Sequence, residues 1–105
     1  MERERTFLHC AVKTDDGERH IFPEGRNAWA LDNLIRAGAK GCTSIDNPGP
    51  RWAAYVHKLK TVFGLNIETR HEEHHGPYSG WHGRYILRDE VQIIERGVHR
   101  KMEAA

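Results

Sequence analysis

A proline–glycine–proline sequence at residues 48–50 restricts the fold of this chain more than any other feature, because it cannot continue a helix. Before it, apolar residues recur at helical spacing and predict a helix from Asn27, a suitable N-cap, to Ala37, just before Gly38. After it, the second proline suits the first position of a new helix, predicted over residues 51–62. The segment between the two helices therefore has room for one helical turn at most.

The second predicted helix is followed by the pattern of a long-looped hairpin. Residues 65–70 alternate between apolar and polar and predict a half-buried strand. Residues 71–83 are polar and contain glycine, so we expect a loop there, followed by an antiparallel partner strand at residues 84–87. The residues expected to form the core of this helix–hairpin unit are Leu34, Trp52, Val56, Leu59 and Ile67.

The two ends of the chain are expected to add to this unit. Residues 5–22 read as a β-hairpin around the turn sequence Thr-Asp-Asp-Gly. The C-terminal residues from Arg88 are ambiguous between a last strand and a short helix. We predict a single α+β domain over residues 1–105, divided into an N-terminal hairpin (1–24), a helix–hairpin core (26–87) and a C-terminal tail (88–105).

Composition narrows the class of protein. Hydrophobic residues make up 38% of the chain and charged residues 30%, which suits one modest core with a well-solvated surface. No apolar run approaches the roughly 18 to 20 residues of a membrane span, and the charged N-terminus does not resemble a signal peptide. We therefore expect a cytoplasmic protein that does not enter the membrane. Cys10 and Cys42 match no metal-binding spacing and are expected to be buried thiols.

Three sequence segments carry a resemblance to a known family: Asn-Pro-Gly-Pro-Arg-Trp at 47–52, Tyr-Val-His-Lys-Leu at 55–59, and the returning strand with Gly80, His82, Arg84, Tyr85 and Leu87. The chain resembles a small family of functionally uncharacterised bacterial winged-helix proteins, common in alphaproteobacteria and related to phage helix-turn-helix domains. The resemblance implies a winged helix-turn-helix with an additional N-terminal β-hairpin. It supplies no catalytic residues to transfer to this chain.

Winged helices usually bind DNA, and basic side chains on the second helix fit this role. Such a helix can lie in the major groove while the hairpin, or wing, lies beside it. The residues predicted to contact double-stranded DNA are Arg51, His57, Lys58, Lys60, Arg70, His82 and Arg84. This interpretation predicts a small transcriptional regulator or phage-related DNA-binding protein, with no enzymatic activity and no cofactor. The net charge of only +1 favours the alternative, a protein-interaction module or homodimer.

The histidine-rich stretch at residues 71–75 formally matches the His-Glu-x-x-His motif of zinc proteases. That chemistry needs both histidines on one face of a helix, whereas a strand pattern precedes the motif and Gly76-Pro77 follows it. A polar wing is the favoured interpretation, and Trp81 and Tyr78 are expected to pack it onto the domain. Non-catalytic metal capture is a less favoured alternative, for which the ligands would be His71, His74, His75 and His82.

Overall fold

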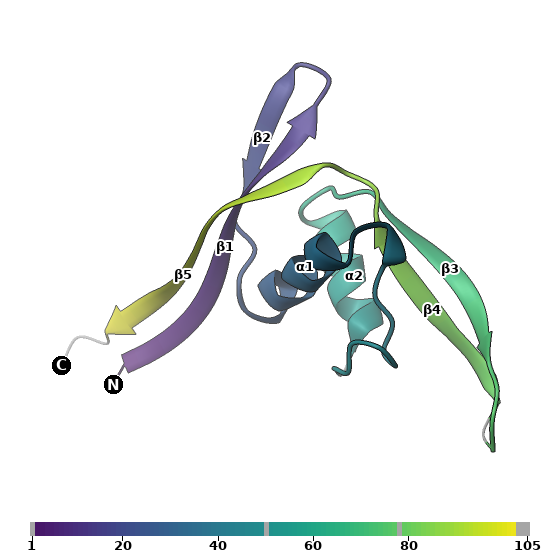
Figure 1. The fold of residues 1–105 in the computed structure, drawn as a ribbon. Coiled ribbons are helices and arrows are strands. Elements are labelled where there is room, and N and C mark those ends of the chain that lie inside the picture. Colours follow the sequence, from purple (N-terminus) through teal and green to yellow (C-terminus); the bar gives the residue numbers. More distant parts are fainter. Residues whose placement is uncertain (1, 50, 78, 103–105) are drawn as a thin grey trace.

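The computed structural model describes residues 2–49, 51–77 and 79–102 and contains two antiparallel sheets beside two helices. Both helices lie between the two sheets (Figure 1). The elements in chain order are β1 (Glu2–Thr14), β2 (Gly17–Ile21), α1 (Gly25–Ala37), a 3₁₀ turn η1 (Gly38–Lys40), α2 (Trp52–Thr61), β3 (Ile67–His74), β4 (Gly80–Leu87) and β5 (Val91–Met102).

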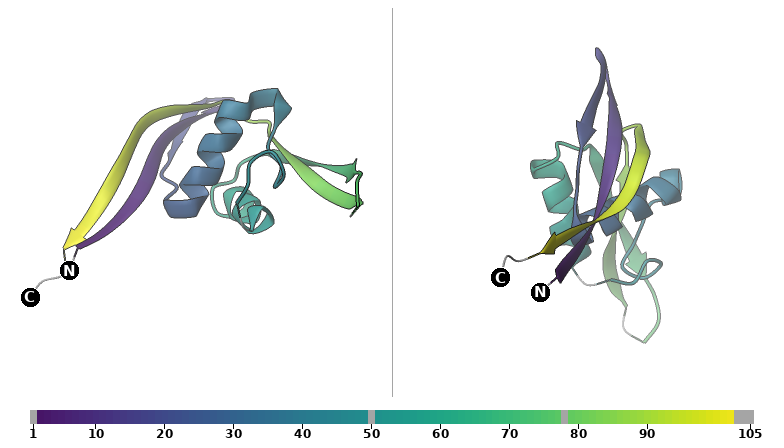
Figure 2. Two further views of the ribbon diagram at one scale, coloured as in Figure 1. Left: turned by 60° about the horizontal axis from the view of Figure 1, so that its bottom comes forward. Right: turned by 90° about the vertical axis from the view of Figure 1, so that its left-hand side faces the viewer.

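The first sheet has the strand order β2-β1-β5. β1 and β2 form a hairpin in which Thr14 pairs with Gly17, so Asp15 and Asp16 make the turn, as the sequence predicted. The C-terminal segment is a strand, because β5 pairs with β1 along almost its whole length. Beyond the reach of β2, the β1–β5 ribbon projects away from the helices, on the side opposite the second hairpin (Figure 2).

Strand pairing, rather than a side-chain cap, sets the start of α1. The predicted N-cap, Asn27, is wrong, because the helix begins at Gly25 with Glu24 as N-cap. Glu24 forms an isolated antiparallel bridge with Phe7, and the Leu8 amide donates to the Pro23 carbonyl at 3.0 Å. The end of the helix is as predicted, at Gly38, whose amide donates to the Leu34 carbonyl.

The core forms where α1, α2, β1 and β3 meet. The five residues predicted to be buried are confirmed, since each is at most 4% exposed: Leu34, Trp52, Val56, Leu59 and Ile67. Cys10 and Cys42 are also buried and are free thiols. Burial raises the pKa of each thiol to about 11, so both remain protonated at neutral pH and pack as small apolar groups.

The entry to α2 is held by aromatic contacts. The Trp52 indole donates to the Asn47 carbonyl at 2.7 Å, and a Cβ at Gly49 would lie 2.5 Å from the Trp29 ring. Helix α2 spans residues 52–61, one residue shorter at each end than predicted. Arg51 is its N-cap and adopts the left-handed conformation (φ 64°). The prediction for the first helical position fell on Pro50, which lies outside the described residues.

The second sheet is the β3–β4 hairpin, and its predicted antiparallel pairing is confirmed by the register from Ile67–Leu87 to His74–Gly80. The predicted loop at residues 71–83 is wrong in extent, since the strands continue through most of it. The sequence did not indicate these strands, because the outer part of the hairpin has no buried face. Its residues therefore do not alternate between apolar and polar. Residues 71–74 are therefore strand, not the helix of a zinc-protease motif.

A third extended segment attaches the hairpin to the helices. Cys42 and Tyr85 exchange backbone hydrogen bonds of 2.8 and 2.9 Å. Gly41, with φ +71°, brings the chain against β4, and a Cβ there would lie 2.5 Å from the Tyr85 carbonyl oxygen. This contact fixes the hairpin beside α2.

We expect Gly41→Ala to lower the free energy of unfolding by at least about 2 kcal/mol, because it combines backbone strain with a clash against β4. Gly38→Ala is the matched control, since Gly38 also has positive φ (+56°) but open space around it. It should cost only the backbone strain of an alanine at φ 56° and ψ −135°, about 1 to 3 kcal/mol, and less than Gly41→Ala. Equal losses for the two variants in urea unfolding would show that the Gly41 contact contributes nothing.

Candidate nucleic-acid interface

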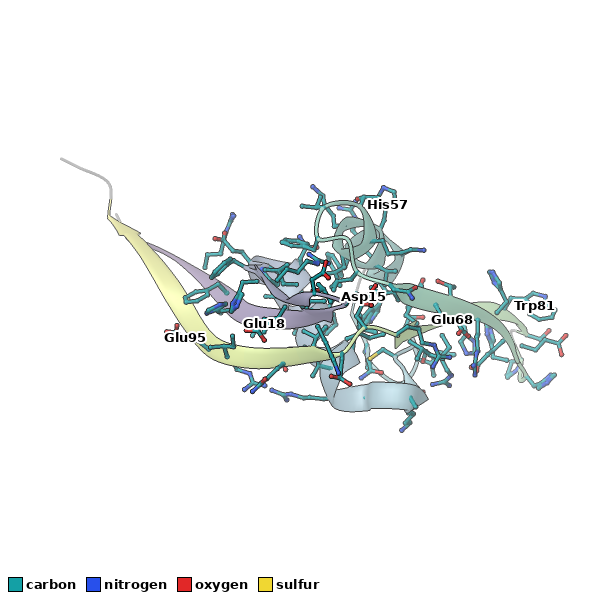
Figure 3. All side chains as sticks on the ribbon, turned by 90° about the horizontal axis from the view of Figure 1, so that it is seen from above. Asp15, Glu18, His57, Glu68, Trp81 and Glu95 are labelled. Atoms are coloured by element: carbon teal, nitrogen blue, oxygen red, sulfur yellow. The ribbon has the colours of Figure 1, made fainter. Side chains whose placement is uncertain are left out.

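Helix α2 presents a polar face to solvent. Its apolar side is buried through residues spaced at helical intervals, so the remaining positions point outward. Arg51, His57 and Lys58 are exposed, as the sequence predicted, and Lys60 is exposed as well. Figure 3 places His57 on the outer side of α2, away from the sheets.

Positive charge is concentrated in the segment of the chain that contains α2. No acidic residue occurs between Asp46 and Glu68, whereas Arg51, Lys58 and Lys60 lie there. This segment therefore carries +3 with histidines neutral, and because the whole chain carries +1, the remaining residues carry −2. The near-neutral total conceals a local cationic helix. This signal is readable in the sequence but is lost when only the net charge is considered.

The cations of this segment are also uncompensated. Within the described residues, the side chains of Arg51, Lys58 and Lys60 make no ion pair and no hydrogen bond. Several arginines elsewhere are ion-paired, for example Arg36 and Arg96 with Asp32. Uncompensated cations at exposed positions are available to an external anion such as a phosphate.

The outer face of α2 carries small side chains near the start of the helix. Ala53 is exposed and precedes His57 by one helical turn and Lys60 by about two, so the three share a stripe. Ala54 beside it is half-buried. A helix with alanines on its outer face can approach a groove closely while longer side chains from its second turn reach sideways.

The basic residues predicted on the hairpin are placed differently from those on α2. The Arg84 guanidinium donates to the Glu72 carboxylate at 2.7 Å, to the Lys40 carbonyl at 3.0 Å and to Asp46 at 3.4 Å. The His82 ring bonds the same Glu72 carboxylate at 3.1 Å, and the His82 side chain is only 14% exposed. These two residues thus tie the hairpin to itself and to the η1 region.

The remaining hairpin cation, Arg70, is exposed and forms an ion pair with Glu68. Glu68 also accepts from Arg88 at 2.7 Å, so one carboxylate is shared between two guanidinium groups. Hydrogen bonds from Arg88 and then Arg70 lower the pKa of Glu68, while Arg84 does the same for Glu72. Both carboxylates are therefore ionised at neutral pH. Together with Glu73 they more than offset Arg70 and Arg84, so β3 and β4 carry −1 with histidines neutral.

The arrangement of a presented helix beside a β-hairpin agrees with the comparison with known families. A family model described as a winged helix domain matches residues 20–97, which is more than half of the chain. The chain belongs to the winged helix domain family. Neither the curated proteins nor the solved structures contain a match.

In this winged helix domain the four wing histidines do not converge. His74 and His82 approach each other, with 3.0 Å between their Nδ1 atoms. His71 lies at a strand position of opposite parity from His74, so its side chain leaves the other face of the hairpin. In the part of the chain that the structure describes, no three histidine, cysteine or acidic side chains are grouped to hold a metal ion.

The aromatic residue of the wing does not anchor it to the domain. Trp81 is 66% exposed and lies near the far end of β4, so its predicted packing is wrong (Figure 3). The reason is the length of the strands, which carry Trp81 outward instead of folding it back. Tyr78, the second predicted anchor, lies outside the described residues.

Among the described helices of the winged helix domain, none is both long and apolar enough to cross a membrane.

Proposed function

We propose that this winged helix domain binds double-stranded DNA by placing α2 in the major groove. The observation that carries the proposal is the uncompensated positive charge of Arg51, Lys58 and Lys60 on the presented helix of a mixed-charge protein. Double-stranded DNA offers closely spaced phosphates on both sides of a groove wide enough for a helix. His57 on the exposed face is available for a base edge or a phosphate.

A purely structural role accounts for only part of this charge. Lys58 and Lys60 lie in the last turn of α2, where cations interact favourably with the helix dipole. Arg51 is at the opposite end, where a cation is unfavourable, and the first turn has no acidic residue. The unfavourable placement of Arg51 supports a role for it outside the folding of the helix.

The wing contributes in two ways under this proposal. His82 and Arg84 orient the wing through their bonds to Glu72, Lys40 and Asp46 rather than contacting DNA themselves. Arg70 is exposed and can exchange its partner Glu68 for a phosphate, because Arg88 remains to neutralise that carboxylate. The proposed contacts are thus Arg51, His57, Lys58, Lys60 and Arg70.

The proposed contacts also support a class and a cellular location for the protein. We assign the protein to the cytoplasm of bacteria as a small transcriptional regulator or phage-related DNA-binding protein, acting without a cofactor and without catalysing a reaction. Nothing in the proposed contacts requires bond chemistry, since phosphate and base recognition by a helix uses only charge and hydrogen bonds.

A second candidate function, docking of a protein partner, has an observation of its own. Trp81 is 66% exposed and Phe22 is 56% exposed. Exposed tryptophan is a frequent anchor of protein interfaces. The two functions use different surfaces, because Trp81 lies at the wing and Phe22 follows β2, whereas the uncompensated cations lie on or beside α2.

Salt-dependent binding to DNA tests the proposal. The protein is titrated against a fluorescent mixed-sequence duplex at several salt concentrations, with anisotropy as the readout. The three cations of the α2 segment alone predict that log K falls with log salt with a slope of about −2.7, following about −0.9 per contact, and a phosphate contact from Arg70 steepens the slope to about −3.6. Binding that is absent, or independent of salt, would reject the proposal and favour the protein-docking function.

A further inference from the structure

The His74–His82 pair lies outside the proposed DNA contacts and has the geometry of two metal ligands. The rings come from opposite strands of the wing, with their centroids 5.2 Å apart and an interplanar angle of 27°. Their Nδ1 atoms face each other at 3.0 Å. Such a contact requires one nitrogen to carry a proton and the other to offer its lone pair.

We propose that these two Nδ1 atoms bind a divalent transition-metal ion of borderline softness, such as Zn²⁺ or Cu²⁺, in place of the shared proton. Zinc–nitrogen distances of about 2.0 to 2.1 Å with tetrahedral angles place two ligand nitrogens about 3.3 Å apart. The observed separation is a few tenths of an ångström shorter, which a small rotation of the rings supplies. Binding releases one proton, and water completes the coordination.

The surroundings of His82 resemble the support that metal-binding histidines usually have. Its second ring nitrogen, Nε2, lies 3.1 Å from a Glu72 carboxylate oxygen. The other oxygen of this carboxylate accepts from Arg84 at 2.7 Å. A carboxylate that accepts from Nε2–H fixes the tautomer in which Nδ1 carries the lone pair, and it strengthens that nitrogen as a ligand.

The position of His74 depends on the residue opposite it. His74 pairs with Gly80 across the hairpin, and a Cβ at residue 80 would lie 3.3 Å from the Nε2 atom of His74. The absence of a side chain at Gly80 gives the His74 ring room beside β4 and directs its Nδ1 toward His82. Both ligands are therefore preoriented by the paired strands, which reduces the entropy lost on chelation.

The site is a two-histidine chelate, and its selectivity follows from its ligands. Imidazole nitrogen suits zinc, copper and nickel, whereas Mg²⁺ prefers oxygen. An ion held by both strands links β3 to β4 near the outer end of the wing. The inference does not depend on DNA binding, since neither histidine belongs to the proposed α2 contacts.

Isothermal titration of the untagged protein with ZnCl₂, and with MgCl₂ for comparison, tests this site. We expect one saturable zinc site and no magnesium binding. His74→Ala should weaken zinc binding at least about tenfold, because a chelate gains strongly from its second ligand. His71→Ala is the matched control, since it removes a histidine from the same strand but from the opposite face.

Circular dichroism establishes that the variants fold, and His74→Gln provides a second test that keeps a polar side chain at this position. Loss of zinc binding in both His74 variants, with normal binding in His71→Ala, supports the site. Equal weakening by His71→Ala would overturn it and indicate unspecific capture by scattered histidines. Absence of a saturable zinc isotherm for the wild-type protein would also overturn it.

Discussion

Replacing Leu59 by alanine is expected to lower the free energy of unfolding by about 2 to 5 kcal/mol. Leu59 is fully buried on the inner face of α2, in the cluster that contains Trp52, Val56 and Ile67. Its carbonyl also accepts the Leu65 amide at 3.1 Å, so the surrounding backbone is fixed and cannot collapse into the cavity. Two-state unfolding in urea measures the loss.

Val62→Ala is the control for the Leu59 experiment. Val62 directly follows α2 but is 62% exposed, and truncation there should change the free energy of unfolding by less than about 0.5 kcal/mol. A loss below about 1 kcal/mol for Leu59→Ala, or a similar loss for both variants, would mean that the inner face of α2 is misassigned.

The helices and the core were predictable because helical spacing reports directly which face is buried. Leu34, Val56 and Leu59 lie on apolar stripes that only a helix brings together, and all three are buried. The pairing of β3 with β4 was equally accessible at its inner end, where Ile67 is buried and constrains the register.

The outer wing could not be predicted because its stability does not come from an apolar face. Its strands are joined by backbone pairing and by the polar contacts of Glu72 with His82 and Arg84. Such contacts join residues ten and twelve positions apart, and no local pattern in the sequence indicates them. For the same reason His82 and Arg84 were predicted as DNA contacts, whereas we now propose that they orient the wing.

Two further features depended on long-range structure. The C-terminal segment is a strand because it pairs with β1, whose residues lie 79 to 100 positions earlier in the chain, so β5 could not be predicted from local sequence. The left-handed conformation of Arg51 could not be predicted from residue propensities either, because non-glycine residues adopt it uncommonly. Because glycine adopts this conformation without strain, glycine is the substitution that suits residue 51 in the test of DNA binding.

That test uses Arg51→Gly combined with Lys58→Ala. Glycine at residue 51 removes the charge and also relieves the left-handed strain, so the double variant should remain as stable as the wild-type protein. If both side chains contact phosphates, affinity should fall for all duplex sequences, and the salt slope should become shallower by about two, one for each lost charge. Thermal unfolding confirms that the variant is folded.

The matched control removes the same charge from elsewhere on the surface. Lys13 pairs with Glu90, and Arg36 pairs with Asp32, so Lys13→Ala with Arg36→Ala lowers the net charge by two without touching α2. A general electrostatic attraction would be weakened equally by both double variants. If α2 contacts DNA directly, the affinity for DNA would be lowered only by the changes at residues 51 and 58.

The salt slope of these two double variants against one mixed-sequence duplex tests the account most directly. DNA recognition by α2 predicts a slope shallower by about two for Arg51→Gly with Lys58→Ala, and a slope close to that of the wild-type protein for the control. Identical slopes for both double variants and the wild-type protein would contradict the assignment of α2 as the DNA-contacting helix.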